Sequence, residues 1–241
     1  MKGTEDVSLL VNQMNFKEKV ERSLELINEA YKRYKNSLVV ANSLGKDSSV
    51  VWALAKRVDS HIRGFIVTTR FKPPQTVSFM KFLVKKYPEL KIFHNNIEIP
   101  DKLYLYDPDR CCYLLKVIPT RNAIKDMKVR CWVTGLRSTE GRTRTNFKEV
   151  EERDAGLIKL NPILVWKERE VWQYIALHKL DVNPLYGDGY RSLGCEPCTI
   201  IAHDENERAG RWSGTSKCGG ECGIHTQPLR INEEVLIEDL L

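Results

Sequence analysis

The first part of the chain carries apolar residues at steps of three and four positions between Phe16 and Tyr34. This spacing places them on one face of a helix, with charged residues on the other faces. The apolar set is Phe16, Val20, Leu24, Ile27, Tyr31 and Tyr34. We therefore predict an amphipathic helix within an N-terminal helical segment over residues 1–35.

Short apolar runs alternate with helical patterns over residues 36–182. The runs lie at 38–41, 63–68, 91–94, 131–134 and 158–160, and helical spacing begins near Asp47 and recurs at 77–87 and 168–178. Apolar runs of this length, each followed by a turn and a helix, are typical of parallel strands buried on both faces. The alternation predicts an α/β domain with a doubly wound, mostly parallel sheet.

Three loops follow the predicted strands at positions where a ligand would be expected. Ligands of doubly wound sheets bind at the carboxyl ends of the strands. The residues at those ends are 43–48, 68–72 and 135–137. We therefore expect these three loops to line one crevice, which makes them the first candidates for a binding site.

The chain changes character after residue 182. Gly, Pro, Cys and charged residues dominate, and no long apolar period remains. Such a segment cannot form a core of its own, so we expect residues 183–241 to pack as a cap on the α/β domain. The stretch after His225 ends acidic and apolar, and one interpretation is a helix that docks on a neighbouring chain.

Composition narrows the class of protein further. The 241 residues are 42% hydrophobic and 29% charged, which is typical of a soluble globular protein. The net charge of +6 suits an anionic small ligand and does not require a nucleic acid. No stretch approaches the roughly 18 apolar residues of a membrane span, and no apolar secretory segment opens the chain. We therefore expect a cytoplasmic protein that has no membrane or nucleic-acid partner.

Ser43-Leu44-Gly45-Lys46-Asp47-Ser48 lies between a predicted strand and a predicted helix. Backbone N–H groups at a helix start bind anions, and glycine lets the backbone approach a ligand closely. Ser43 and Ser48 supply hydroxyl donors, and Lys46 supplies a positive charge. We expect a phosphate or sulfate site involving Ser43, Gly45, Lys46 and Ser48. The alternative is a capped turn without a ligand.

Seven cysteines, an odd number without an export signal, argue against a disulfide framework. Cys111 and Cys112 are adjacent, and Cys195 and Cys198 form a Cys-x-x-Cys pair. Four thiolates complete the ligand set of zinc or of a [4Fe–4S] cluster. Adjacent cysteines favour the cluster, whose ligands bind different iron atoms. A redox Cys-x-x-Cys and buried inert thiols are the alternatives.

Glu221-Cys222-Gly223-Ile224-His225 contains a further candidate, because a thiolate near cations is a strong nucleophile. The alternative is an unreactive terminal thiol. Cys131, by contrast, lies in an apolar run and is expected in the core.

Five motifs in order make the chain similar to the sulfonucleotide reductase family, the assimilatory adenylyl-sulfate and phosphoadenylyl-sulfate reductases. They are 166–172 (WKEREVW), 183–186 (NPLY), 189–199 (GYRSLGCEPCT), 207–212 (ERAGRW) and 221–225 (ECGIH). The loop at 43–48 resembles the pyrophosphate-binding loop of the adenine-nucleotide-binding α-hydrolase-like superfamily, with Leu44 in place of a glycine. That superfamily's fold is the one the resemblance implies.

The resemblance implies a reaction and its participants. Cys222 would attack the sulfate sulfur of adenylyl sulfate, AMP would leave, and thioredoxin or glutaredoxin would release sulfite from an enzyme S-sulfocysteine. Arg137, Arg208 and Arg211 match substrate-contacting arginines. The four cysteines Cys111, Cys112, Cys195 and Cys198 match the ligands of a [4Fe–4S] cluster, and Lys116 matches a lysine that links the cluster to the substrate. Members with these cysteines usually prefer adenylyl sulfate over its 3′-phosphorylated form.

The chain departs from the family pattern at several positions. A phosphoadenylyl-sulfate reductase is one alternative function. Lys46 is typical of the superfamily's ATP pyrophosphatases, so an ATP pyrophosphatase or adenylyltransferase is a second. A third alternative is a metal-bearing nucleotide sensor or sulfur-modification partner without turnover. The family's Asp-Thr-Gly stretch reads Thr68-Thr69-Arg70, and Ser138 follows Arg137 where the family often has a second arginine. Cys218 is extra, and it is either an incidental thiol or a resolving partner of Cys222.

Overall fold

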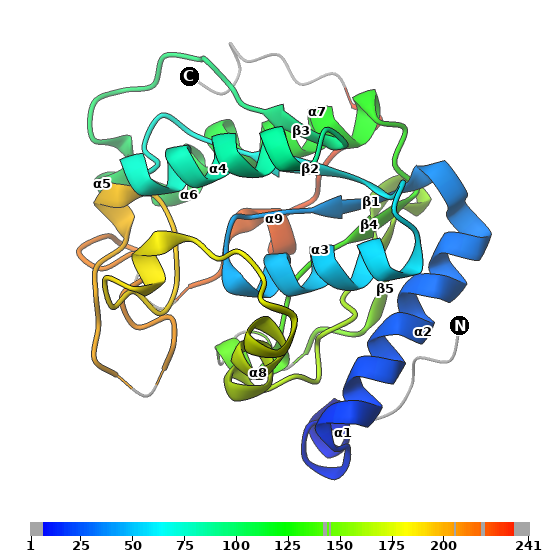
Figure 1. The fold of residues 1–241 in the computed structure, drawn as a ribbon. Helices are drawn as coiled ribbons and strands as arrows, with labels where there is room; N and C mark the ends of the chain where they lie inside the picture. The colour runs from blue at the N-terminus through cyan, green and yellow to red at the C-terminus, as the bar shows by residue number, and fades with distance from the viewer. Residues whose placement is uncertain (1–6, 142–143, 145, 205, 218–219, 234–241) are drawn as a thin grey trace.

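The computed structural model describes residues 7–141, 144, 146–204, 206–217 and 220–233. Its centre is a sheet of strand order β3-β2-β1-β4-β6-β5 (Figure 1). The strands are β1 Leu38–Ala41, β2 Arg63–Val67, β3 Leu90–Phe93, β4 Cys131–Val133, β5 Val150–Glu152 and β6 Ile158–Leu160. All neighbouring pairs are parallel except β5 with β6. The predicted doubly wound, mostly parallel sheet is therefore confirmed.

Helices cover both faces of this sheet (Figure 1). The first face packs against α2 Phe16–Tyr34, α3 Lys46–Val58, α4 Pro74–Lys86 and α8 Glu168–His178. The second face packs against α7 Ile118–Asp126 and the short α9 Gly223–Thr226. The remaining helices are α1 Val7–Gln13, α5 Leu103–Tyr106 and α6 Pro108–Cys112, followed by a π-helical stretch over Tyr113–Val117. No described helix is long and apolar enough to cross a membrane.

Alternation along the strands divides the core between the two faces. In β4, Cys131 and Val133 belong to the first core, whereas Trp132 belongs to the second. Cys131 is fully buried, as expected of a core thiol, and burial raises its pKa to about 12. The Cys131 thiol is therefore protonated and inert at neutral pH.

The predicted helices and strands agree with the structure to within a few residues, but two regions were missed. The edge strand β5 is short and includes Glu151 and Glu152, so it has no apolar run to reveal it. The helical stretch 103–126 is broken into pieces by Pro108 and Pro119 and contains the adjacent cysteines. Its apolar residues consequently do not show one continuous helical period.

The C-terminal segment runs as turns and short 3-10 helices, at Pro184–Tyr186 and Glu196–Cys198, and ends the described chain beyond α9. Residues Ser192–Gly194, Arg208 and Arg211 line the same pocket as the loop after β1, so the segment crosses the carboxyl ends of the strands. Leu229 packs against the second core. Cys218 and the end of the tail, 234–241, lie outside the described residues.

A buried ion pair fixes the N-terminal helix to the domain. Lys19 in α2 is fully buried, and its Nζ donates to both carboxylate oxygens of Glu170 in α8, at 3.0 and 2.9 Å. The same Nζ donates to the Val11 carbonyl of α1. This lysine thus joins the two N-terminal helices to α8, which is far away in the sequence.

Removing one partner of such a pair leaves a buried charge without compensation, which typically costs about 3–5 kcal/mol. We expect Lys19→Met to lower the free energy of unfolding by about 3 kcal/mol in urea titrations. Lys17→Met is the matched control, because the Lys17 side chain is 85% exposed on the same helix. An equal, small effect of both substitutions would contradict this role of Lys19.

Candidate active site

A pocket of about 190 Å³ opens at the carboxyl ends of β1, β2 and β4. Its wall includes residues of the loop 43–48, Lys72 from the loop after β2, and Gly135 and Leu136 after β4. The crevice expected from the strand ends is therefore present. The C-terminal segment closes it with Ser192, Arg208, Arg211, Cys222 and His225.

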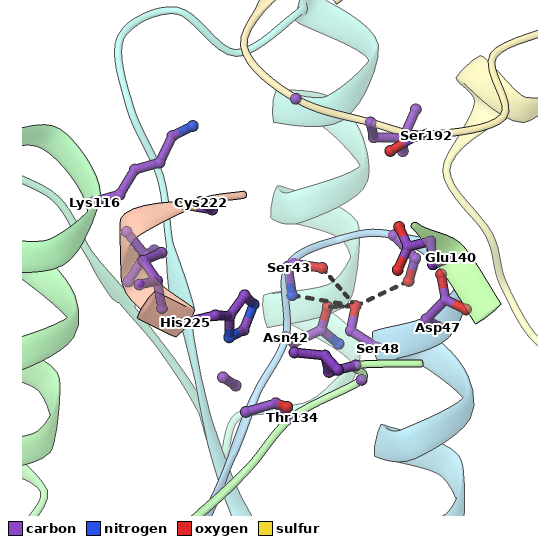
Figure 2. A pocket seen from close by; sticks show the side chains of 18 of the residues that line it. Asn42, Ser43, Asp47, Ser48, Lys116, Thr134, Glu140, Ser192, Cys222 and His225 are labelled. Atoms are coloured by element: carbon purple, nitrogen blue, oxygen red, sulfur yellow. Dashed lines mark hydrogen bonds between the residues drawn. The ribbon is translucent and has the colours of Figure 1, made fainter. Parts of the chain in front are cut away.

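The loop 43–48 is held in shape by its own side chains. Ser48 Oγ accepts a hydrogen bond from the Ser43 backbone N–H at 3.1 Å and donates to the Gly45 carbonyl at 2.9 Å (Figure 2). Leu44 adopts a left-handed conformation with φ of +68°, although it is not glycine. A Cβ on Gly135 would lie 2.8 Å from the Ser48 backbone nitrogen, so only glycine lets β4 approach this helix start.

Lys46 and Arg137 do not face the pocket as free cations. Lys46 Nζ lies 2.9 Å from Glu207 Oε2 and 3.4 Å from Asp47 Oδ2, and only 1% of its side chain is exposed. Arg137 Nη2 donates to the same Glu207 oxygen at 2.6 Å, and its Nε pairs with Asp47. Arg137 is fully buried behind the pocket and is not part of its lining. Glu207 thus fastens the C-terminal segment to the loop 43–48, the expected phosphate loop.

A second set of ion pairs leads from this point to Cys222. Arg144 pairs with Glu140 and, through two nitrogens, with Glu221. Arg208 lies 3.4 Å from Glu140 and 3.2 Å from Glu221. Glu221 Oε1 also accepts the backbone N–H of Cys222 at 2.8 Å.

Taken together, the two sets balance in charge; Glu168, 3.9 Å from Lys46, adds no net charge because it is paired with Arg191. The cations Lys46, Arg137, Arg144 and Arg208 are matched by the carboxylates Asp47, Glu140, Glu207 and Glu221. We call these eight residues the balanced network.

At the opposite end of the pocket lie cations that form no ion pair with any carboxylate of the described residues. Lys72, Lys116 and Arg211 line the pocket there and lie within electrostatic range of one another. Burial lowers the pKa of Lys72 to about 8; Cys195 and Cys222 oppose this effect, while Lys116 and Arg211 add to it. Burial also lowers the pKa of Lys116, but negative charge at Cys195, Cys112 and Cys222 outweighs it and leaves this pKa raised. Figure 2 shows Lys116 beside Cys222, across the pocket from Asp47 and Glu140.

Cys222 lies at the start of α9, at this cationic end. A hydrogen bond with the Cys112 thiol holds the pKa of Cys222 well below its ordinary value, and the charge of Lys116 acts in the same direction against burial. His225 follows one turn later, with its ring stacked on Trp132 at 6.1 Å. Burial lowers the His225 pKa, so its imidazole is neutral at pH 7.

The four cysteines proposed as ligands come together from two distant segments. Cys111, Cys112, Cys195 and Cys198 are all free, buried thiols that line one small cavity next to the main pocket. In the described part of the chain, no three His, Cys, Asp or Glu side chains are close enough together to hold one metal ion. A cluster distributes four thiolates over separate iron atoms, and four cysteines around one cavity suit that arrangement. Burial opposes ionisation of Cys195, but Lys116 and Lys72 outweigh it and lower its pKa.

Comparison with known proteins identifies the family. Residues 37–201 match the family model described as the phosphoadenosine phosphosulfate reductase domain. The chain belongs to this family. An adenosine 5′-phosphosulfate reductase of Halalkalibacterium halodurans is 36% identical to this chain over 233 residues, or 91% of this chain and 99% of the relative. A Staphylococcus epidermidis protein of the same name is 32% identical over 89% of this chain and 91% of its own length.

Two solved structures share the fold of the reductase. The phosphoadenylyl-sulfate reductase of Candida auris, in a phosphate complex, gives a TM-score of 0.65 at 23% identity over 83% of this chain and 98% of that chain. An FMN adenylyltransferase of Candida glabrata gives 0.64 at 14% identity over 98% of this chain and 86% of its own. The fold class expected from the family resemblance is thereby confirmed.

Sequence reasoning missed several residues of the reductase site. Glu207 and Glu221 are the first residues of two of the family motifs. Their ion pairs could not be foreseen, because the partners Lys46, Arg137 and Arg144 lie far away in the chain. Arg144 and Glu140 follow the loop after β4, where no motif distinguishes them. Lys72 lies in a loop already expected at the crevice, so its position was a usable signal. The same reasoning expected Lys46 and Arg137 to bind the substrate, which stays a prediction; in the structure both are paired with carboxylates.

The Glu221 carboxylate makes the closed site sensitive to acid. Its pairing with Arg144 lowers the pKa of Glu221 to about 2, against the effect of burial. A lowered native pKa stabilises the fold above the ordinary carboxyl pKa, and this contribution disappears as the pH falls from about 5 towards 2. A shift of this size corresponds to about 3 kcal/mol.

We expect Glu221→Gln to lower the free energy of unfolding by about 2–3 kcal/mol at pH 7, with a smaller difference from the parent protein at pH 3. Urea unfolding at both pH values measures this. Glu233→Gln is the control, because Glu233 is 61% exposed in a surface pair with Arg230. If the loss caused by Glu221→Gln were the same at pH 3 and pH 7, the proposed linkage would be wrong.

Proposed function

We propose that the protein reduces adenylyl sulfate to sulfite and AMP through an S-sulfocysteine at Cys222, with a thioredoxin-like dithiol as electron donor. One observation carries the proposal. Cys222 lies at the end of the pocket lined by Lys72, Lys116 and Arg211, opposite the loop 43–48 that is expected to bind phosphate. Curated relatives covering most of this chain are named adenosine 5′-phosphosulfate reductases.

The proposed reaction has three steps. The Cys222 thiolate attacks the sulfate sulfur, the bond from that sulfur to the bridging oxygen breaks, and AMP leaves with the electron pair. A thiolate of the donor then attacks Cys222 Sγ, and sulfite leaves with the electrons of the S–S bond. The second thiol of the donor resolves the mixed disulfide and restores Cys222. Lys116 and Arg211 offset the repulsion between the thiolate and the anionic substrate.

Cys111, Cys112, Cys195 and Cys198 are the residues that would hold a [4Fe–4S] cluster. When bound, the cluster would supply structural support and an electrostatic field near Cys222, because the electrons of the reaction come from thiols. Lys116 and Lys72 lower the pKa of Cys195, which favours the thiolate form that a cluster ligand must have.

The balanced network supports adenylyl sulfate as the preferred substrate. Four carboxylates already neutralise the cations on the phosphate-loop side of the pocket. An additional 3′-phosphate on that side would meet carboxylates rather than free cations, and burying an unpaired anion is costly. Lys46, the residue that suggested ATP chemistry, is itself held in this network, so the structure does not favour an ATP pyrophosphatase.

Sulfite formation from adenylyl sulfate with a thioredoxin and its reductase tests the proposal. We expect Cys222→Ser to abolish turnover while it still binds AMP, because only the nucleophile is removed. Cys131→Ala, a core thiol on β4, should retain turnover. The 3′-phosphorylated nucleotide should give a lower kcat/KM. Turnover by Cys222→Ser, or no sulfite from the parent protein, would contradict the proposal.

Iron analysis of the protein purified without oxygen tests the cluster. We expect brown protein with about four iron atoms per chain, and loss of iron on Cys198→Ser or Cys111→Ser. Cys131→Ala should keep its iron, since that thiol lies in the apolar core on β4. Colourless parent protein, or one zinc ion per chain, would contradict the assignment.

A further inference from the structure

Lys72 is a cation of the active site that none of the motifs identified. It lies in the loop between β2 and α4, directly before Pro73 and Pro74 at the start of α4. Its backbone N–H donates to the Thr69 carbonyl at 3.2 Å. The Lys72 side chain lines the main pocket.

The loop that carries Lys72 is tied to the Cys195 segment at two points. The Phe71 carbonyl accepts the Glu196 backbone N–H at 2.8 Å, and Thr69 Oγ1 lies 3.3 Å from Cys195 Sγ. Both contacts lie just before Lys72 in the sequence, and Thr69 and Phe71 line the small cysteine cavity. The lysine therefore follows a tethered stretch of the loop and lines the main pocket next to that cavity.

Lys72 differs from Lys46 in having no counter-charge. Among the described residues, no carboxylate lies within ion-pair distance of Lys72, and its ammonium group makes no hydrogen bond. The neighbours that influence its charge are Cys195, Lys116, Arg211 and Cys222. A partly buried ammonium group without an anion is unfavourable, so this end of the pocket is electrostatically incomplete without a ligand.

The ligand that would complete it is an anion with several oxygens. Lys72, Lys116 and Arg211 together present three positive charges beside the Cys222 thiol. The balanced network, which runs from the loop 43–48 to Glu221 next to Cys222, has no net charge to offer. The transferred sulfonate group, which must reach Cys222 Sγ, is the part of the substrate that fits between these three cations.

We propose that Lys72 is a catalytic residue that donates hydrogen bonds to the sulfonate oxygens while Cys222 attacks the sulfur. The inference rests on the proposed function, because it takes Cys222 as the nucleophile. Lys72 transfers no proton in this step. Its charge offsets the repulsion between the thiolate and the sulfonate as the new S–S bond forms and the bond to the AMP oxygen breaks.

The alternative is that Lys72 acts on Cys195 rather than on the substrate. In that case the lysine would stabilise the Cys195 thiolate and the metal centre, and its loss would reduce activity only through loss of iron. The two roles differ in what they do to substrate affinity at constant iron content, and the experiment is built on this difference.

The experiment compares Lys72→Met and Lys72→Arg with Lys81→Met. Lys81 is exposed on α4, so its substitution makes the same change in charge outside the pocket. We expect Lys72→Met to lower kcat/KM for adenylyl sulfate about 10- to 100-fold. Iron content should be unchanged, Lys72→Arg should recover most of the loss, and Lys81→Met should match the parent protein.

Binding measured in a Cys222→Ser background gives a second readout. Lys72→Met should weaken binding of adenylyl sulfate at least tenfold more than binding of AMP, because AMP lacks the sulfonate. Unchanged kinetics, equal effects on both nucleotides, or a loss of activity that parallels loss of iron would overturn the inference. The proposed function fails separately, if the parent protein makes no sulfite.

Discussion

Pairing of buried cations with carboxylates from the C-terminal segment is the interaction on which the rest of the site depends. Glu207 joins Lys46 on α3 to Arg137 after β4, and Glu221 joins Arg144 and Arg208 beside Cys222, the proposed nucleophile. The C-terminal segment has few apolar residues of its own. These ion pairs, in place of an apolar core, hold it against the α/β domain. Removing one partner would leave the others buried and uncompensated, which makes the closed arrangement strongly preferred.

The same pairing decides where positive charge remains available. Cations near the phosphate loop are neutralised internally, whereas Lys116 and Arg211 remain free of carboxylates beside Cys222. A site for thiolate attack on an anionic sulfur needs cations at the reacting atoms rather than around the nucleotide in general. The cysteines of α6 and of the turn 195–198 lie next to these unpaired cations. The proposed cluster, the cations and the proposed nucleophile are therefore close enough to influence one another's charge.

Sequence reasoning recovered the sheet, and it named many of the residues that line the candidate site, because both follow from local patterns. Apolar runs identified five of the strands, and the strand-end rule placed the three loops around one pocket. It did not identify β5, whose residues are charged and which forms only by pairing with β6. It also could not show that Lys46 is neutralised by Glu207, since the two residues are 161 positions apart. Charge balance depends on such long-range contacts, so the sequence revealed the cations but not which of them are free.

A single-turnover reaction without reductant tests the central claim most directly. Stoichiometric adenylyl sulfate is mixed with the reduced protein, released AMP is quantified, and the protein is digested for mass spectrometry. The account predicts one AMP per chain and one sulfonate group on Cys222, which thioredoxin then removes as sulfite. Release of AMP without an adduct, or an adduct on another cysteine, would contradict the assignment of Cys222 as the nucleophile.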